Sequence, residues 1–305
     1  MTNKNNKKLG FSLIELSIVI LIIGILVAGV TQGSRLVGRS KLTAAKSLTQ
    51  SSPVTGIKDL SMWLETTSDK SFKSIEASDG TPISAWYDIE DVSNKTNASI
   101  ATVATTGTAI KYMENSINGL PTVRFNSASD YYFTLNDQGA FLNNNSYSVF
   151  YVVRLSASPA AGGTRPILAS NTTAIAGGTV NSLAFFNAVT ATTFKICESN
   201  TAAANCSNTT YPFGTPIPQI ISVISADTTN IKSIYLNGNN TVLNSGAAVA
   251  LPNMTDLTIG KNNTNYFVGD IGEIIVFTRA LTNSERQSVE CYLGKKWGIS
   301  GPTCA

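Results

Sequence analysis

Histidine is absent from this sequence of 305 residues. Without an imidazole, the chain cannot build a Ser-His-Asp triad, a Cys-His dyad or a histidine-ligated zinc site. Charged residues are also scarce, at 13% of the chain, against about 25% in an average soluble protein. The 22 basic and 19 acidic residues leave a net charge of only +3, which excludes a nucleic-acid partner held by strong positive charge.

Cysteine is limited to four residues, and none of them has the CxxC spacing of a metal site. Together with the low charge, this usage favours an exported protein over a cytosolic enzyme. Four cysteines allow three pairings. We expect the two local ones, Cys197–Cys206 and Cys291–Cys304, because each brackets one short loop. A closed loop of about 15 residues contributes roughly 3 kcal/mol in the chain-entropy model.

One long apolar run is present, and a basic leader precedes it. Residues 1–10 carry three lysines and no acid, and residues 11–30 contain a single charge, Glu15. A helix over residues 11–30 spans about 30 Å, the thickness of the hydrocarbon core of a bilayer. A secretory signal peptide has a shorter apolar region with small residues after it, whereas here Gly10 precedes the run. The pattern predicts a membrane-spanning helix.

Glu15 is unusual within that span. A carboxylate in a membrane helix costs about 2.5 to 3.5 kcal/mol on insertion scales. One interpretation is a polar residue near the end of the span that reaches the lipid headgroups. The other is a charge pair with a neighbouring subunit, whose Phe11 carries a new α-amino group once the bond after Gly10 is cut.

The residues KKLG followed by FSLIEL resemble the type IV pilin family, with Gly10, Phe11 and Glu15 in the family's places. The resemblance covers roughly the first 40 residues. It implies cleavage between Gly10 and Phe11 by a membrane prepilin peptidase and N-methylation of Phe11. It also implies that Glu15 takes part in assembly through the amine of a neighbouring subunit.

Four basic residues follow the span, with no acid between residues 31 and 50: Arg35, Arg39, Lys41 and Lys46. Since the leader carries three lysines, the positive-inside rule does not set the orientation. Three interpretations stay open for these residues, namely contacts with acidic lipid headgroups, contacts with neighbouring subunits, or a solvated helix face.

The helix is expected to continue to about Gln50, because Pro53 forces the residue before it out of the α region. Beyond it, short β runs alternate with turn residues, which predicts an antiparallel two-sheet jelly roll. The expected strands are residues 61–65, 83–89, 122–126, 131–135, 146–155, 166–170, 183–187, 193–197, 219–226, 231–238, 256–260 and 271–278. Thr282 and Glu285 form a capping box for a short last helix that ends near Gly298. We therefore expect a leader (1–10), a pilin helix (11–52, membrane-spanning 11–30) and a mostly-β sandwich (53–305).

Four segments beyond the predicted pilin helix resemble laminin-G or concanavalin-A-like jelly-roll domains. They are MWLE (62–65), ISAWYD (83–88), NGLPTVRFNSASDYYF (118–133) and GDIGEIIVFTRALTNSERQSVECYLGKKWG (269–298). The resemblance implies a two-sheet jelly roll, a fold often used to bind glycans or protein surfaces, sometimes with calcium. The fold alone does not give the function.

A glycosidase on such a fold needs two carboxylates roughly 5 to 9.5 Å apart. Asp88 and Glu90 are the nearest candidates, since alternate residues of a strand share a face, but the residues that follow indicate a strand end and a loop. Asp270 and Glu273 bracket Gly272, and we expect them on different faces. We therefore predict no catalytic residue and no enzyme.

Calcium stays open as a cofactor, although no EF-hand spacing is present. The candidate oxygen donors are Asp79, Asp88, Asp91 and Asp270, and turns are the competing use for these acids. Trp63, Trp86 and Trp297 lie in apolar patterns, which favours core packing. The candidates for a sugar-binding surface are the tyrosines near loops, Tyr131, Tyr132, Tyr211 and Tyr266.

These patterns predict a filament subunit, a minor or adhesive pilin whose exposed sandwich binds a surface, a glycan or a protein partner. The alternative is a pseudopilin of a type II-like secretion system, and a membrane-tethered glycosidase is disfavoured. The expected partners are other pilin subunits, a prepilin peptidase and the inner membrane. The expected location is the inner membrane for a single-pass precursor, followed by an extracellular pilus or a periplasmic pseudopilus.

Overall fold

The computed structural model describes residues 12–90, 98–102, 110–126, 131–135, 146–155, 165–170, 182–187, 193–199, 204–210, 216–226, 231–240, 242–244, 257–262 and 265–304. By its internal contacts, the chain divides between Thr43 and Ala44 into two compact units.

The first unit holds most of α1 (Leu13–Gln50), which ends at the predicted residue. Its large apolar side chains between residues 13 and 37 are exposed, from 50% at Val19 to 86% at Leu13. A 3-10 turn, η1 (Val54–Gly56), follows the helix directly after Pro53. The apolar surface of the helix between residues 13 and 37 is therefore not buried by the rest of the described chain.

One sheet of the second unit has eight strands in the described residues. In hydrogen-bonded order they are β14 (Asn239–Asn240), β13 (Ile231–Leu236), β12 (Gln219–Ala226), β7 (Tyr147–Leu155), β19 (Gly269–Phe277), β5 (Leu120–Phe125) and β4 (Lys111–Ile117), with β1 (Leu60–Glu65) also paired to β19. All nine residues of β19 are buried. The central position of β19 makes it the strand on which the rest of this sheet is assembled.

The second sheet has nine strands in the described residues, and a two-stranded hairpin accompanies it. Their order is β15 (Val242–Asn244), β11 (Ala204–Thr210), β10 (Thr193–Ser199), β9 (Ser182–Asn187), β8 (Arg165–Ser170), β16 (Leu257–Ile259), β6 (Tyr131–Leu135), β3 (Ala98–Thr102) and β2 (Ala85–Trp86). The hairpin consists of β17 (Lys261–Asn262) and β18 (Asn265–Tyr266). The strand pairs are antiparallel, so the predicted mostly-β antiparallel fold is confirmed.

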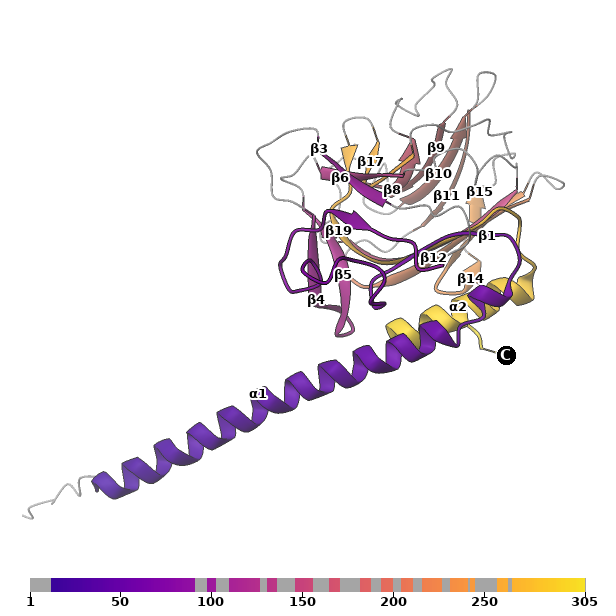
Figure 1. Cartoon of the computed structure of the whole chain (residues 1–305). Helices are drawn as coiled ribbons and strands as arrows, with labels where there is room; N and C mark the ends of the chain where they lie inside the picture. The colour runs from indigo at the N-terminus through magenta and orange to yellow at the C-terminus, as the bar shows by residue number, and fades with distance from the viewer. Residues whose placement is uncertain are drawn as a thin grey trace, which may run out of the picture. The chain divides into compact units, whose positions relative to one another are not determined.

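Two apolar cores hold this unit together. The inner core lies between the sheets and contains Trp86, Phe133 and Ile274 among its buried members. The outer core lies on the outer face of the eight-stranded sheet and joins Phe150 and Ile275 to side chains of α2 (Asn283–Trp297). Figure 1 shows α2 in yellow along this sheet, with the last turns of α1 beside it. The order of layers is thus helix, sheet, sheet.

The predicted strand over residues 83–89 is wrong in length, because only Ala85–Trp86 pair. Beyond them, the Asp88 carboxylate accepts a hydrogen bond from the backbone N–H of Glu90, at 3.0 Å, and the chain bends. The sequence reading also missed β3, β4 and β11. β4 reads KYMENSI and β11 reads ANCSNTT, and neither shows the strict alternation of apolar and polar residues that identifies a half-buried strand.

Candidate functional site

The beginning of α1 is capped by two of its own residues. Ser12 Oγ accepts a hydrogen bond from the backbone N–H of Ile14, at 3.4 Å. Glu15 Oε2 in turn accepts one from the backbone N–H of Ser12, at 2.9 Å. This reciprocal pattern matches the S-x-x-E signature of a capping box. Glu15 therefore stabilises the start of the helix within its own chain, a role that the sequence reading missed although the signature is present.

Gly10 and Phe11, the predicted processing residues, lie outside the described residues. The helix that follows them is long and apolar enough to cross a membrane. The apolar side chains of this helix are not buried by any other part of the described chain. Ile14, Leu21 and Val30 are 69%, 63% and 71% exposed. A large exposed apolar surface of this kind marks a site of protein or membrane interaction.

The last two turns of α1 belong to the second unit and are fixed to it. Ala45 is buried at 2% exposure, and Leu48 packs against the outer core. Thr49 Oγ1 lies 3.2 Å from the Tyr292 hydroxyl of α2. Lys46 also pairs with Asp69 at 2.6 Å. The end of the helix is thereby an integral part of the sandwich.

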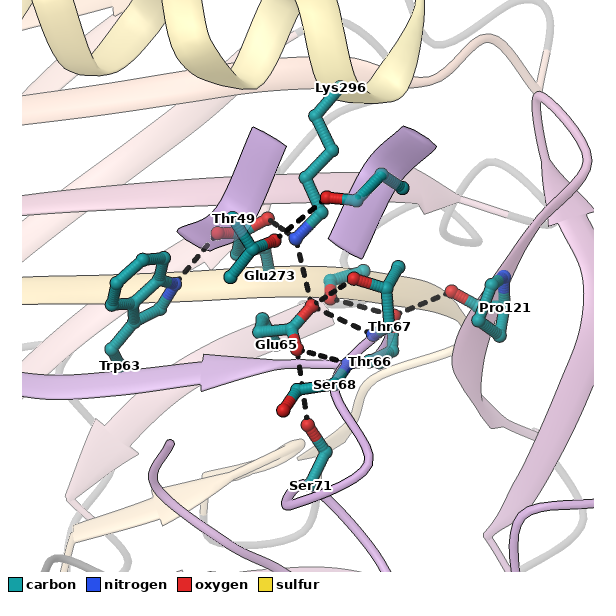
Figure 2. Close-up of polar contacts among 12 residues, drawn as sticks. Thr49, Trp63, Glu65, Thr66, Thr67, Ser68, Ser71, Pro121, Glu273 and Lys296 are labelled. Carbon is teal, nitrogen blue, oxygen red and sulfur yellow. Dashed lines mark hydrogen bonds and ion pairs between the residues drawn. The ribbon is translucent and has the colours of Figure 1, made fainter. Parts of the chain in front are cut away.

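Beneath α2 lies a fully buried cluster of charges (Figure 2). Glu65 of β1 and Glu273 of β19 stand directly opposite each other in the strand register. Lys296 descends from α2 and places its ammonium 2.8 Å from Glu65 Oε2 and 2.9 Å from Glu273 Oε2. All three side chains have 0% exposure. One lysine thus bridges a cross-strand pair of like charges that would otherwise repel.

The remaining oxygen positions of the two carboxylates are occupied by further donors. Glu65 accepts hydrogen bonds from the backbone N–H and the hydroxyl of Thr67, at 2.7 and 2.6 Å, and from the backbone N–H of Ser68. Glu273 accepts bonds from the indole N–H groups of Trp63 and Trp297, at 2.7 and 2.8 Å. It also accepts one from the hydroxyl of Tyr292, at 2.8 Å.

The pKa values of Glu65 and Lys296 are shifted in directions that keep both groups charged. Burial would raise the pKa of Glu65, but the charge and hydrogen bond of Lys296, with the bonds from Thr67, hold it below its ordinary value of 4.5. Burial would lower the pKa of Lys296, yet Glu273 and Glu65 raise it above 10.5. The cluster therefore acts as a structural ion network that ties together β1, β19 and α2.

The strand register sets the carboxylates of Glu65 and Glu273 directly opposite each other, but this pair is unsuited to catalysis. A glycosidase needs its carboxylates open to a substrate, whereas Glu65 and Glu273 are sealed and saturated with donors. Sequence reasoning missed the pair, because 208 positions (273 − 65) separate its members and no local motif links them.

The expectation that Asp270 and Glu273 point to different faces is wrong. The β19–β7 register shifts between Ile271 and Glu273, which marks a bulge at Gly272. Because a bulge inserts one extra residue, both acids lie on the outer face: Glu273 under α2, and Asp270 beside Arg124 and Arg154. They still serve separate ion clusters.

Asp270 is 2% exposed and is held by two arginines. Its Oδ1 lies 2.7 Å from Arg124 Nε, and its Oδ2 lies 3.0 Å from Arg154 Nε. Of the other calcium candidates, Asp79 accepts a bond from the backbone N–H of Glu114, at 3.0 Å, and Asp88 accepts the bond from Glu90 described above. Asp91 lies outside the described residues. In the described part of the chain, no three acidic, cysteine or histidine residues gather as a metal site would require.

Of the four tyrosine candidates, the three that the structure describes are buried or half-buried. Tyr131 packs against the inner core, and Tyr132 is 8% exposed. Lys261 of β17 lies 4.2 Å from the Tyr132 ring centre and 5.9 Å from that of Tyr266. Tyr211 lies outside the described residues. The three tryptophans are core residues as predicted, each with at most 1% exposure.

One of the two predicted disulfide bonds is present in the structure. Cys291 and Cys304 form a disulfide, with a Cα–Cα distance of 5.1 Å. Cys197 and Cys206 are direct Cα partners in the antiparallel β10–β11 register. Opposed residues in such a pair have Cα atoms about 4.5 or 5.5 Å apart, which is compatible with a disulfide. The second bond stays a prediction.

The family model described as the prokaryotic N-terminal methylation motif matches residues 5–31. The chain carries the N-terminal motif of type IV prepilins. This motif supports a type IV pilin or a pseudopilin, and with the apolar helix it fits a membrane-anchored precursor. No curated protein matches the chain in sequence.

Solved structures match the sandwich at low sequence identity. Domain 4 of an extracellular arabinanase from Geobacillus stearothermophilus, solved with arabinotriose, is 13% identical with a TM-score of 0.51, and the match covers 76% of this chain and 97% of that one. A chain of botulinum neurotoxin type C, from work on its interaction with gangliosides, is 11% identical with a TM-score of 0.53. The match covers 79% of this chain and 53% of the toxin chain, so it spans about half of that relative. These likenesses show a common fold.

Proposed function

We propose that the protein is a type IV pilin-like filament subunit whose N-terminal helix serves first as a membrane anchor and then as part of a filament core. The observation that carries this proposal is the continuity of three features in one segment. The methylation motif covers residues 5–31, a single helix runs from Leu13 to Gln50, and the apolar side chains of that helix are exposed up to Val37.

The sandwich is the part that such a filament would display, and we propose that it binds a glycan, a surface or a protein partner as a minor or adhesive pilin does. The support is at the level of the fold: the arabinanase domain was solved with arabinotriose, and the toxin is described as interacting with two ganglioside molecules. The alternative is a pseudopilin of a type II-like secretion system, which has the same N-terminal segment.

The proposed role is structural rather than enzymatic. The motif favours assembly, and the opposed carboxylates Glu65 and Glu273 are occupied by Lys296. The partners in this proposal are other copies of the chain, a prepilin peptidase that cuts between Gly10 and Phe11, and the inner membrane. After assembly, the sandwich would lie outside the cell or in the periplasm.

Assembly can be tested by separating the two roles of Glu15. Glu15→Gln keeps the helix cap, since glutamine also serves in a capping box, but it removes the charge that would meet the Phe11 amine of a neighbour. Ser12→Ala removes the side-chain half of the cap and keeps the charge. We expect Glu15→Gln subunits to insert normally and to give few or short filaments, because breaking a buried ion pair costs about 3 to 5 kcal/mol.

The measurement is a filament count by electron microscopy beside the amount of subunit in the membrane fraction. Intact mass shows whether residues 1–10 have been removed and one methyl group added. Ser12→Ala should assemble almost normally, since loss of a cap costs about 1 kcal/mol. Normal filaments from Glu15→Gln subunits alone would leave only the capping role for this residue.

The adhesive role has its own test. A glycan array probed with residues 44–305 should show a restricted set of bound glycans if the protein is an adhesive pilin. A pseudopilin should bind none of them and should instead support secretion of a protein substrate in the host cell.

A further inference from the structure

Beyond the apolar span, the described part of α1 carries a small cationic surface made of Arg35 and Arg39. The two side chains are one turn apart, at positions i and i+4, so they lie on the same face of the helix. Both are exposed. No acid occurs between residues 31 and 50, and no ion pair joins either arginine to another residue that the structure describes.

The other two basic residues of this segment are placed differently. Lys46 is paired with Asp69 at 2.6 Å. Lys41 lies six residues after Arg35, which at about 100° per residue puts it on another side of the helix. The surface therefore rests on Arg35 and Arg39 alone.

The height of the two arginines along the helix matches the headgroup layer of a bilayer. At about 1.5 Å per residue, Arg35 lies roughly 7.5 Å and Arg39 roughly 13.5 Å beyond Val30, the last residue of the span. The polar layer on each side of the hydrocarbon core is roughly 5 to 8 Å thick. Helical side chains lean toward the N-terminus, and arginine stems extend so that the charge reaches the interface. Both guanidinium groups can therefore reach lipid phosphates.

Two apolar residues lie at the same height along the helix as the arginines. Leu36 and Val37 are 73% and 57% exposed, although they lie beyond the uninterrupted apolar run. At about 100° per residue they project to other sides of the helix than the arginines, so apolar and cationic groups both surround the helix at this height. At a membrane interface, the apolar groups enter the acyl boundary while the guanidinium groups contact phosphates.

We propose that Arg35 and Arg39 bind the phosphate groups of anionic phospholipids, in the leaflet on the sandwich side of the membrane. This inference rests on the proposed membrane-anchored precursor. Guanidinium groups match phosphate oxygens with paired N–H donors, and each arginine near an anionic surface should contribute about a fivefold preference. The contact would hold the helix at a fixed depth until the subunit leaves the membrane.

The experiment uses the full chain, reconstituted into bilayers of phosphatidylcholine with phosphatidylglycerol as the anionic probe. The protein is withdrawn in small discs of surrounding lipid, and mass spectrometry gives the ratio of the two lipids relative to the starting bilayer. Arg35→Gln/Arg39→Gln removes both charges. Arg35→Lys/Arg39→Lys keeps the charges, and Lys58→Gln/Lys70→Gln removes two exposed charges from the sandwich unit.

We expect phosphatidylglycerol to be enriched around the wild-type chain, by up to roughly 25-fold for two arginines, and the enrichment to fall as salt is raised. The Arg35→Gln/Arg39→Gln variant should lose most of it. The lysine variant should keep a large part, and the sandwich control should keep all of it. Equal enrichment in the Arg35→Gln/Arg39→Gln variant, or none in the wild type, would overturn the proposal.

A second readout distinguishes lipids from a neighbouring copy of the chain. If the two arginines instead bind acids of another subunit, the Arg35→Gln/Arg39→Gln variant will keep its lipid enrichment and lose filaments, which also contradicts the proposal. If wild-type chains form filaments without any enrichment, the lipid contact fails while the proposed function stands. If Glu15→Gln subunits form normal filaments while the Arg35→Gln/Arg39→Gln variant loses the phosphatidylglycerol enrichment, only the proposed role of Glu15 in assembly fails.

Discussion

At the scale of single residues, the arrangement of Glu65, Glu273 and Lys296 decides how α2 is attached. Two carboxylates face each other across β1 and β19, and one ammonium lies within 3 Å of both, at 2.8 and 2.9 Å. The strand pairing places the acids, and the helix supplies the cation. Folding of the sheet and docking of α2 should therefore be strongly coupled.

Replacing the lysine should destabilise the sandwich severely. Lys296→Met keeps most of the side-chain volume but leaves two buried like charges, so we expect a loss of about 3 to 5 kcal/mol in the free energy of unfolding. Denaturation by urea, followed by tryptophan fluorescence, measures it. Lys295→Met, at the neighbouring position, should change stability by less than about 0.5 kcal/mol. A similar small effect for Lys296→Met would mean that the network contributes little.

The shifted pKa values predict a stability plateau with two limbs. The pKa of Glu65 is lowered from 4.5, and that of Glu285 is lowered to about 2 by hydrogen bonds from Arg279 and Thr282. Their contributions are present above pH 4.5 and are lost as the pH falls through the folded-state values. The pKa of Lys296 is raised above 10.5, and burial raises that of Tyr292 above 10.0, so stability is also lost above about pH 10.

Urea midpoints measured between about pH 3 and pH 11 should trace this plateau. In Glu285→Gln the acid limb should be shallower and the alkaline limb unchanged, since only one of the shifted carboxylates is removed. A midpoint that stays constant down to about pH 3 would contradict the assigned shifts.

At the scale of elements, α2 is fixed by signals at both of its ends. Thr282 and Glu285 form the predicted capping box, and Gly298 ends the helix in the left-handed conformation with φ of 62°. Past Gly298, the tail turns back and Pro302 packs closely on Gly294 and on the turn at Gly238. The disulfide then joins the tail to the middle of α2.

Removing this disulfide should free the tail and weaken the sandwich moderately. Cys291→Ser/Cys304→Ser opens a loop with a sequence separation of 13, which corresponds to about 3 kcal/mol in the chain-entropy model. Limited proteolysis should then cut after residue 298 first, and the urea midpoint should fall. Cys197→Ser/Cys206→Ser is the matched control, because it leaves the Cys291–Cys304 bond intact and should leave the tail protected. An unchanged tail would show that the packing of Pro302 is sufficient.

Local signals explain which elements the sequence predicts. The capping box, the end of α1 before Pro53 and the turns at Asn118 and Asn237 all depend on neighbouring residues, and each is present. The strands β3, β4 and β11 are polar or lack a strict alternation of apolar and polar residues. They form because neighbouring strands pair with them. Propensity is overridden by tertiary contacts in such strands.

The candidate site divides in the same way. The S-x-x-E pattern at Ser12 and Glu15 is readable in the sequence, whereas the contact of Lys296 with Glu65 spans 231 positions. The glycine at the bulge likewise has its reason outside the strand, because a Cβ on Gly272 would lie 2.5 Å from the Trp297 ring. Only the packed sheet and helix show why glycine occurs at this point.

At the scale of the whole molecule, the boundary of the sandwich unit lies inside the long helix. Contacts place Ala44–Ala305 in one unit, whereas the sequence pattern predicts that the sandwich starts at residue 53. Ala45 and Thr49 are 2% and 8% exposed, and Leu48 packs beside them on the outer core. The last two turns of α1 are therefore part of the same packed unit as α2.

A pair of soluble fragments tests this boundary. Residues 44–305 keep the last turns of α1, and residues 54–305 lose them. At about 0.8 kcal/mol per buried methylene, the loss of Ala45 and of the buried half of Leu48 should lower the free energy of unfolding by about 2 kcal/mol. The Thr49 contact with Tyr292 is lost as well. Urea denaturation of both fragments gives the difference directly.

Lys46→Gln in the longer fragment is the control, because its exposed partner Asp69 limits that pair to less than about 1 kcal/mol. Equal midpoints for the two fragments would place the boundary after Gln50 instead. A large effect of Lys46→Gln would transfer the stabilisation from the apolar contacts of α1 to its ion pair.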